Sequence, residues 1–328
     1  MSPSFPTTDE LVAGIRARDR SLLARAITLV ESGRATDRER AHALLDALLP
    51  ENEHSIRIGV SGPPGVGKST FIEALGLALV ERGKRVGVLA VDPSSTVSGG
   101  SILGDKARME RLSLTDGAFI RPSPSARELG GVARRSREAL LVLEAAGFDV
   151  LLVETVGVGQ SEVLVHTMTD HFLVLAQPGS GDELQGIKRG ILELANVVCV
   201  HKADGEREPL AREAATQLSS ALRIARGGDE GWSVHLASSL EAQGHADVWT
   251  ALETRDRTRS RSGEKAHLRA EQRVRWMHRA AHEEVTRFLA TDSVLADALA
   301  SLEAKVKDGL KTPARAESLV RAQLERRE

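Results

Sequence analysis

The sequence predicts an α/β protein in which a mostly parallel central sheet is flanked by helical regions at both ends of the chain. Between residues 55 and 256, short apolar runs alternate with helical stretches, which is typical of a parallel sheet covered on both faces. Outside this region the apolar residues recur every three or four positions, the period of amphipathic helices. We therefore expect an N-terminal helical domain at 1–54, a core domain at 55–256 and a C-terminal helical arm at 257–328.

The N-terminal region is expected to form a helical hairpin. Thr8 or Asp9 can cap a first helix, which Gly33 ends. A second helix begins near residue 36 and stops before Pro50.

Seven strands are expected in the core domain. In a parallel sheet the functional loops lie at the carboxyl ends of the strands, so the residues after each strand are the candidates for chemistry. The predicted strands are 56–60, 86–91, 118–120, 150–153, 172–176, 197–200 and 234–237.

After residue 256 the strand pattern ends, and three helices are expected. Val274, Met277 and Phe288 lie on the apolar stripe of the first helix, the second begins at Ser293, and the third follows Pro313. Such a tail either folds back on the core or pairs with a second subunit.

Composition excludes several classes of protein. The net charge of −2 argues against a general polyanion binder, so no nucleic-acid partner is expected. A single cysteine, Cys199, cannot build a disulfide framework or a zinc cluster within one chain. No run reaches the roughly 20 apolar residues of a membrane span. The first residues lack the apolar core of a secretion signal, so we expect a cytoplasmic protein.

A glycine-rich segment, GPPGVGKS at 62–69, lies between the first predicted strand and a helix. In such a loop the backbone N–H groups turn towards phosphate oxygens, and the helix N-terminus adds its dipole. Lys68 would place a positive charge at the terminal phosphates, and Ser69 would offer its hydroxyl to Mg²⁺. The residues predicted to bind the nucleotide here are Gly62, Pro63, Pro64, Gly65, Val66, Gly67, Lys68, Ser69 and Thr70.

Acidic residues directly follow two other predicted strands, at the edge where Mg²⁺ and an attacking water would lie. These residues, Asp92 and Glu154, are both candidates for binding the metal and for catalysis. Phosphoryl transfer depends on positioning and electrostatics, and Asp92 is the better candidate for holding Mg²⁺ or orienting the water. Gly157 could sense the terminal phosphate through its amide, and Gln160 is a second candidate for positioning the water. With the phosphate loop, these residues predict a P-loop nucleotide hydrolase.

The base-binding loop is expected at HKAD, residues 201–204. Guanine-specific hydrolases carry N-K-x-D here, and its carboxylate accepts hydrogen bonds from N1–H and the 2-amino group, which adenine cannot offer. Lys202 and Asp204 fit this pattern. His201 replaces the asparagine that ties this loop to the phosphate loop, and an imidazole lacks the paired donor and acceptor of an amide, so weaker base affinity is expected. A backbone amide that contacts the guanine oxygen is expected in the loop formed by Ser238, Ser239 and Leu240.

These segments together resemble the MeaB family of GTPases, which are associated with adenosylcobalamin-dependent methylmalonyl-CoA mutase. The resemblance runs from about residue 8 to residue 320. The motifs that carry it are GPPGVGKST, VDPSS, GSILGDKARM, RPSPS, GGVARR, ETVGVGQSE, PGSGDELQGIK and KADG.

The resemblance implies a slow GTPase that binds GTP, GDP and Mg²⁺ and gates the loading, protection and repair of the mutase's cobalamin. It implies switch-like loops at 92–108, 154–162 and 177–188 that communicate with the mutase, with Asp105 near the metal. It also makes the C-terminal helices a dimerisation arm, and hence the protein a homodimer. The sequence carries no D-x-H-x-x-G cobalamin-ligating motif, which fits a chaperone of the cobalamin enzyme.

Three other classes remain open from the residues alone, and one of them is a binding module that never hydrolyses nucleotide, which Asp92 and Glu154 argue against. A metallochaperone GTPase would need a Cys/His cluster, whereas the ten histidines are scattered. An ATP-dependent P-loop ATPase is suggested by His201, although Asp204 argues for guanine. Arg108 and Arg121 are candidates for an arginine finger.

Overall fold

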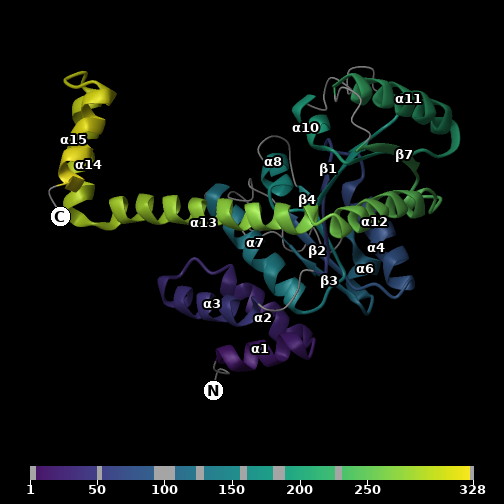
Figure 1. The fold of residues 1–328 in the computed structure, drawn as a ribbon, viewed down its shortest axis with the longest axis horizontal. Helices are drawn as coiled ribbons and strands as arrows, with labels where there is room; N and C mark the ends of the chain where they lie inside the picture. The colour runs from purple at the N-terminus through teal and green to yellow at the C-terminus, as the bar shows by residue number, and fades with distance from the viewer. Residues whose placement is uncertain are drawn as a thin grey trace. The chain divides into compact units, whose positions relative to one another are not determined.

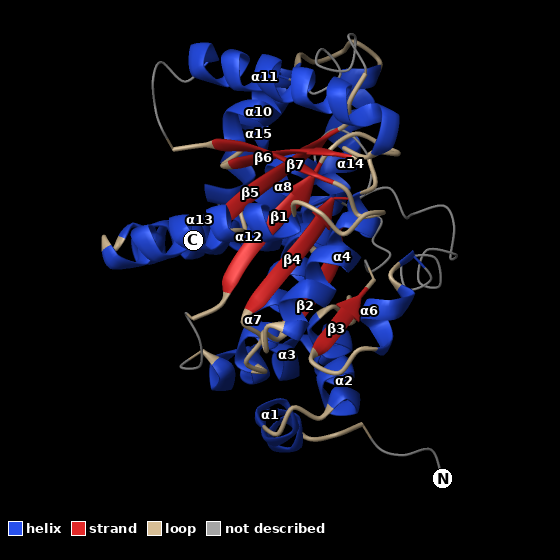
Figure 2. Cartoon of the chain, turned by 90° about the vertical axis from the view of Figure 1, so that its right-hand side faces the viewer, coloured by secondary structure: helices blue, strands red, loops and turns tan. Residues whose placement is uncertain are grey.

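The computed structural model describes residues 5–49, 54–91, 108–122, 129–155, 161–179, 189–225 and 231–325. The chain divides into two compact units, Met1–Gln272 and Arg273–Glu328. The first unit contains a seven-stranded sheet with the order β3-β2-β4-β1-β5-β6-β7 (Figure 1, Figure 2), and every strand pair in it is parallel. The predicted α/β class is confirmed. The strands are β1 Ile56–Ser61, β2 Val86–Val91, β3 Ala118–Arg121, β4 Val150–Thr155, β5 His171–Ala176, β6 Val197–His201 and β7 Ser233–Ala237.

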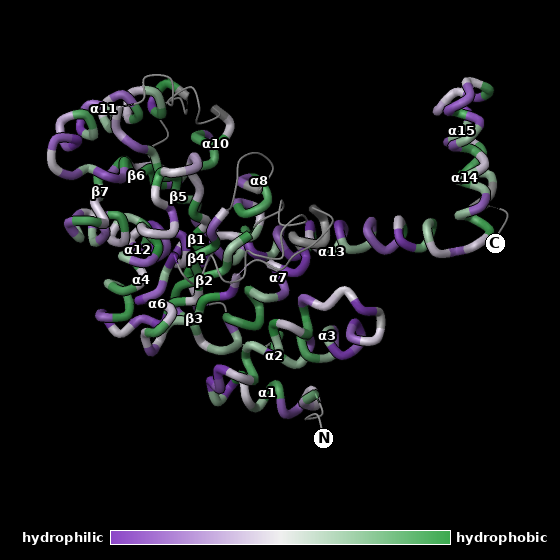
Figure 3. The backbone as a smooth tube through the Cα atoms, turned by 180° about the vertical axis from the view of Figure 1, so that it is seen from behind, coloured by the Kyte–Doolittle hydropathy of each residue, from purple (hydrophilic) through white to green (hydrophobic). Residues whose placement is uncertain are grey.

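Successive side chains of a strand point to opposite faces of the sheet, and the central strands are apolar on both faces. Helices therefore pack on both faces of this sheet. Ile58 and Val60 of β1 belong to a buried core that includes side chains of α4, α6 and α12. Gly59 points the other way, where a Cβ would come within 2.8 Å of Val165 in α8. The strands form the apolar centre of the unit in Figure 3. The following helices contact strands of the sheet: α4 Lys68–Glu81, α6 Glu110–Leu114, α7 Leu129–Ala145, α8 Ser161–His166, α10 Arg189–Leu194, α11 Glu208–Ala225 and α12 His245–Arg261.

The N-terminal region has three helices where two were predicted: α1 Thr8–Arg16, α2 Arg20–Val30 and α3 Ala35–Leu48. Arg18 has a left-handed φ of 65°, which interrupts the helix and separates α1 from α2. Asp19 then caps α2 with its side chain, and Thr7 caps α1 in a capping box with Glu10, one residue earlier than predicted. The break was missed because the apolar residues keep their helical spacing across it.

An ion pair ties α2 to the end of β3. The Arg121 guanidinium donates from Nε to Glu31 Oε2 at 3.0 Å, and a second bond runs from its Nη2. Burial raises the pKa of Glu31, and the hydrogen bonds and charge of Arg121 oppose that rise. Arg121, one of the two candidate arginine fingers, is therefore engaged in holding the N-terminal helices.

Replacing Arg121 by Ala should lower the free energy of unfolding by about 1–3 kcal/mol at pH 7.5, because the Glu31 carboxylate stays buried without its partner. A carboxyl group whose pKa is raised in the folded state destabilises that state fully above the raised pKa, and the penalty fades as the pH falls towards the pKa of the unfolded chain, so the loss should shrink towards pH 5. Urea unfolding at both pH values measures this difference. Arg212→Ala, which removes an exposed ion pair with Glu208, is the control and should change stability by less than about 1 kcal/mol. Equal losses at both pH values would contradict the role given to Glu31.

Buried charges at the amino edge of the sheet join α12 and the first turns of α13 (Glu264–Thr291) to the strands. Asp170, just before β5, accepts from Arg269 Nε at 2.8 Å and from the Arg57 backbone N–H at 2.9 Å. Burial would raise the pKa of Asp170, but Arg269 outweighs burial and holds it well below its usual range. Lys265 donates to Asp256 of α12 at 3.0 Å. The basic side chains of Lys265 and Arg269 are thus buried within the first unit.

The domain boundary predicted between residues 256 and 257 lies inside α12, and the first compact unit extends to Gln272. The second unit holds the rest of α13 together with α14 Ser293–Lys307 and α15 Pro313–Glu325, the three helices expected from the sequence. Among the described residues, no helix has both the length and the apolar character needed to cross a membrane.

Candidate nucleotide site

The glycine-rich loop connects β1 to α4, as the sequence predicted. Gly62, Gly65 and Gly67 have φ values of 149°, 78° and 95°, a region that favours glycine. A Cβ on Gly62 would lie 2.5 Å from the Leu175 carbonyl oxygen, and one on Gly67 would lie 2.8 Å from the His201 ring. The loop can therefore keep this curl only with glycine at these two positions.

Lys68 and Ser69 open α4 beside the end of β4. Lys68 Nζ donates to the carbonyl oxygens of Gly62 at 2.8 Å and Pro63 at 3.2 Å, so the ammonium lies over the loop. Burial lowers the pKa of Lys68, and the nearby Glu154 opposes this shift. Ser69 Oγ donates to Glu154 Oε1 at 2.8 Å. The structure thus brings together a lysine, a hydroxyl and a carboxylate from the predicted set.

The donor set fits Mg²⁺, which prefers oxygen ligands. Ser69 and Glu154 supply two such oxygens side by side. The other acidic and switch residues predicted here lie outside the described residues, so their roles stay predictions: Asp92, Asp105, Gly157 and Gln160. Within the described ranges, no group of three His, Cys, Asp or Glu residues could hold a metal ion.

The base-binding loop follows β6 and is tied to the phosphate loop by two hydrogen bonds. His201 Nδ1 lies 2.8 Å from the Val66 carbonyl oxygen, so the imidazole makes the connection that asparagine ordinarily makes. Lys202, with a left-handed φ of 61°, donates from Nζ to the Gly65 carbonyl at 2.6 Å. The weaker base affinity expected from His201 stays a prediction, and the hydrogen bond to Val66 shows that the imidazole does connect the two loops.

The loop after β7 supports the predicted guanine-reading carboxylate. Ser238 Oγ donates to Asp204 Oδ2 at 2.7 Å, and Ser239 Oγ lies 3.0 Å from Nε2 of His245, the first residue of α12. Leu240 is 86% exposed. His245 was missed at the sequence level, because no spacing pattern connects it to the base-binding loop.

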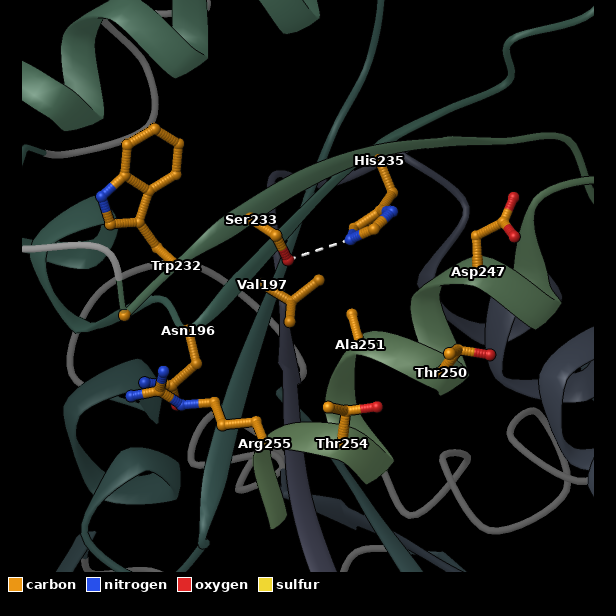
Figure 4. A pocket seen from close by; sticks show the side chains of 11 residues that line it. Asn196, Val197, Trp232, Ser233, His235, Asp247, Thr250, Ala251, Thr254 and Arg255 are labelled. Atoms are coloured by element: carbon orange, nitrogen blue, oxygen red, sulfur yellow. Dashed lines mark hydrogen bonds between the residues drawn. The ribbon is translucent and has the colours of Figure 1, made fainter. Parts of the chain in front are cut away.

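A separate groove of about 580 Å³ lies between β6, β7 and α12 (Figure 4). Asn196 and Val197 at the start of β6 line it, and Ser233 at the start of β7 lies 2.9 Å from His235 Nε2. These residues are at the amino ends of parallel strands, whereas the phosphate loop is at a carboxyl end. The groove is therefore distinct from the nucleotide site.

A phosphate loop on a parallel sheet defines the class of P-loop nucleotide hydrolases, and the K-x-D loop tied to it indicates the guanine-binding branch. The family model described as "Methylmalonyl Co-A mutase-associated GTPase MeaB" matches residues 23–293. The chain belongs to this family, and it is a GTP-hydrolysing enzyme that binds GTP and GDP.

Relatives and a solved structure agree with this membership. The chain is 49% identical to a Mycobacterium tuberculosis protein named "Probable GTPase", over 94% of this chain and 92% of that one. It is 43% identical to the mouse "Methylmalonic aciduria type A homolog, mitochondrial", over 95% of this chain and 78% of the relative. A structure titled "Crystal structure of LAO/AO transport system kinase" superposes with a TM-score of 0.77 at 34% identity, covering 99% of this chain and 100% of that one.

Proposed function

We propose that this GTPase is a chaperone of an adenosylcobalamin-dependent methylmalonyl-CoA mutase. It would hydrolyse GTP slowly and use the nucleotide state to gate the loading, protection and repair of the mutase's cobalamin. The observation that supports this most is the family match itself, because the matched residues 23–293 include both the phosphate loop and the base-binding loop of a family described as mutase-associated. A cytoplasmic location is part of the proposal.

Each polar group at the carboxyl edge has a proposed role in hydrolysis. Lys68 stabilises charge on the terminal phosphates, and Asp92 or Gln160 orients the attacking water. Ser69 and Glu154, which lie in contact, would hold Mg²⁺ with Asp92 and Asp105, and the ion would supply positive charge to the phosphates. Asp204, held by Ser238, reads guanine.

The proposed contacts with the mutase are the loops at 92–108, 154–162 and 177–188. They follow β2, β4 and β5, and both β4 and β5 pair directly with β1, which carries the phosphate loop. Most residues of these loops lie outside the described part of the chain, and their contact with the mutase is proposed from the family match. A pull-down of purified mutase by this chain loaded with a non-hydrolysable GTP analogue or with GDP tests the proposal. Retention should depend on the nucleotide, and no retention in either state would refute it.

We also propose that the helices of 257–328 form a homodimerisation arm. Val274, Met277, Val285 and Phe288 follow the helical repeat along one side of α13, and between 49% and 59% of each is exposed. Met277→Asp should therefore shift the sedimentation mass from dimer to monomer. Arg279→Asp, two residues further and on the opposite side of the helix, should leave the dimer intact. A monomeric native protein would contradict the proposal.

The alternative classes have direct tests. Stoichiometric nickel or zinc in the purified protein would favour a metallochaperone, and tighter binding of ATP than of GTP would favour an ATP-dependent enzyme. Either result would overturn the proposed function.

A further inference from the structure

A chain of hydrogen bonds runs from the phosphate loop through the base-binding loop to α12. His201 Nδ1 lies 2.8 Å from the Val66 carbonyl oxygen, and its Nε2 lies 2.8 Å from Ser239 Oγ. Ser239 Oγ in turn lies 3.0 Å from His245 Nε2. The chain joins three segments that are far apart in the sequence, and it is built around the histidine that stands in the place of asparagine.

The direction of every bond in this chain is fixed by the Val66 carbonyl, which can only accept. His201 must therefore carry its proton on Nδ1. Burial lowers the pKa of His201, so the ring is neutral near pH 7 and its Nε2 can only accept. Ser239 must then donate its hydroxyl proton to His201 and accept from the Nε2–H of His245. Burial and the neighbouring His201 lower the pKa of His245 to about 4, which keeps that ring neutral as well.

Packing holds both rings in place. His201 and His245 are only 2% and 4% exposed, and the Phe71 ring of α4 lies against both, with centroid separations of 5.6 Å and 4.9 Å. The charged residues that act on the His201 ring are Lys202 and Asp204 of its own loop. The orientation of the His201 ring is thus fixed by its two hydrogen-bond partners and by the packing against Phe71.

We propose that Ser239 and His245 are positioning residues that hold the His201 imidazole with its Nδ1–H on the Val66 carbonyl, so that a histidine can replace asparagine in connecting the base-binding loop to the phosphate loop. Without the Ser239 hydroxyl, His201 Nε2 would lose its donor. The imidazole would then be oriented by the Val66 carbonyl alone, and its Nε2 would stay buried without a hydrogen-bond partner. This inference rests on the proposed function only in taking GTP as the ligand.

The first test is a double-mutant cycle on GTP affinity with the native chain, Ser239→Ala, His201→Asn and the combined variant. Ser239→Ala alone should weaken binding about tenfold. In the His201→Asn background it should cost less than about twofold, because no imidazole Nε2 is left for the Ser239 hydroxyl to hold. Equal losses in both backgrounds would overturn the inference. A native chain that does not bind GTP would instead refute the proposed function.

The second test reads the tautomer directly by long-range ¹H–¹⁵N NMR of the full chain labelled at histidine, with His201→Asn used for assignment. The native spectrum should show His201 protonated on Nδ1, and protonation on Nε2 would overturn the inference. His245→Gln keeps an N–H donor and should bind GTP within about twofold of the native chain, whereas His245→Leu should resemble Ser239→Ala. Equal affinities for the Gln and Leu variants would show that the donor at residue 245 is not needed.

Discussion

Lys68→Ala should lower the rate of GTP hydrolysis about 10²–10³-fold, comparable with the loss of a preorganised donor to transition-state charge in other enzymes. The structure places the Lys68 ammonium over the phosphate loop, where it donates to the Gly62 and Pro63 carbonyls. A terminal phosphate bound there would take over these hydrogen bonds, and the ammonium would stabilise the charge that spreads over its oxygens as the bond breaks. Single-turnover release of phosphate from bound GTP measures the rate.

The matched control for Lys68 is Lys84→Ala. Lys84 lies in the turn before β2, at the amino edge of the sheet, so its removal changes net charge equally but leaves the phosphate loop intact. The hydrolysis rate of this variant should stay within about twofold of the native rate, because salt screens the charge of a side chain at the opposite edge of the sheet. A Lys68→Ala variant that hydrolyses GTP at the native rate would remove the phosphate loop from the mechanism.

Asp204→Asn should weaken GTP binding about 10²–10⁴-fold, because two hydrogen bonds to a charged carboxylate, each contributing about 1.5–3 kcal/mol, are replaced by one weaker bond and an N–H that faces the 2-amino group. Ser238 holds one oxygen of Asp204 in place, so the carboxylate is preorganised. An asparagine amide would still accept from N1–H but would donate towards position 2 of the base. It should therefore favour xanthosine triphosphate, which carries a carbonyl there.

Titration of both nucleotides against both proteins measures this change in selectivity. Asp247→Asn, at the amino-edge groove, removes a comparable carboxylate and should leave GTP affinity within about twofold. If Asp204→Asn bound GTP as tightly as the native chain, the K-x-D assignment would be wrong.

The sheet and the phosphate loop could be predicted from the sequence because short, contiguous segments of the chain determine both. Each strand is a short apolar run, and GPPGVGKS needs only its neighbouring strand and helix to be interpreted. The order of the strands could not be predicted in this way, since β4 and β5 flank β1 through pairings between distant segments.

The features that were missed depend on single conformations or on distant partners. The left-handed Arg18 divides a helix whose apolar spacing is unbroken. Arg269 and Asp170 are 99 residues apart, and their buried pair carries no periodic signal. His201 was recognised as a departure from the guanine pattern, but its hydrogen bond to Ser239 exists only once β6 and β7 lie side by side.

The central proposal is that GTP hydrolysis by this chain is coupled to an adenosylcobalamin-dependent mutase. One measurement tests it most directly. The rate of single-turnover GTP hydrolysis would be compared with and without purified adenosylcobalamin-dependent methylmalonyl-CoA mutase. The proposal predicts a slow intrinsic rate that rises when the mutase binds. An equal rate with and without the mutase, at concentrations that saturate the chain, would contradict it.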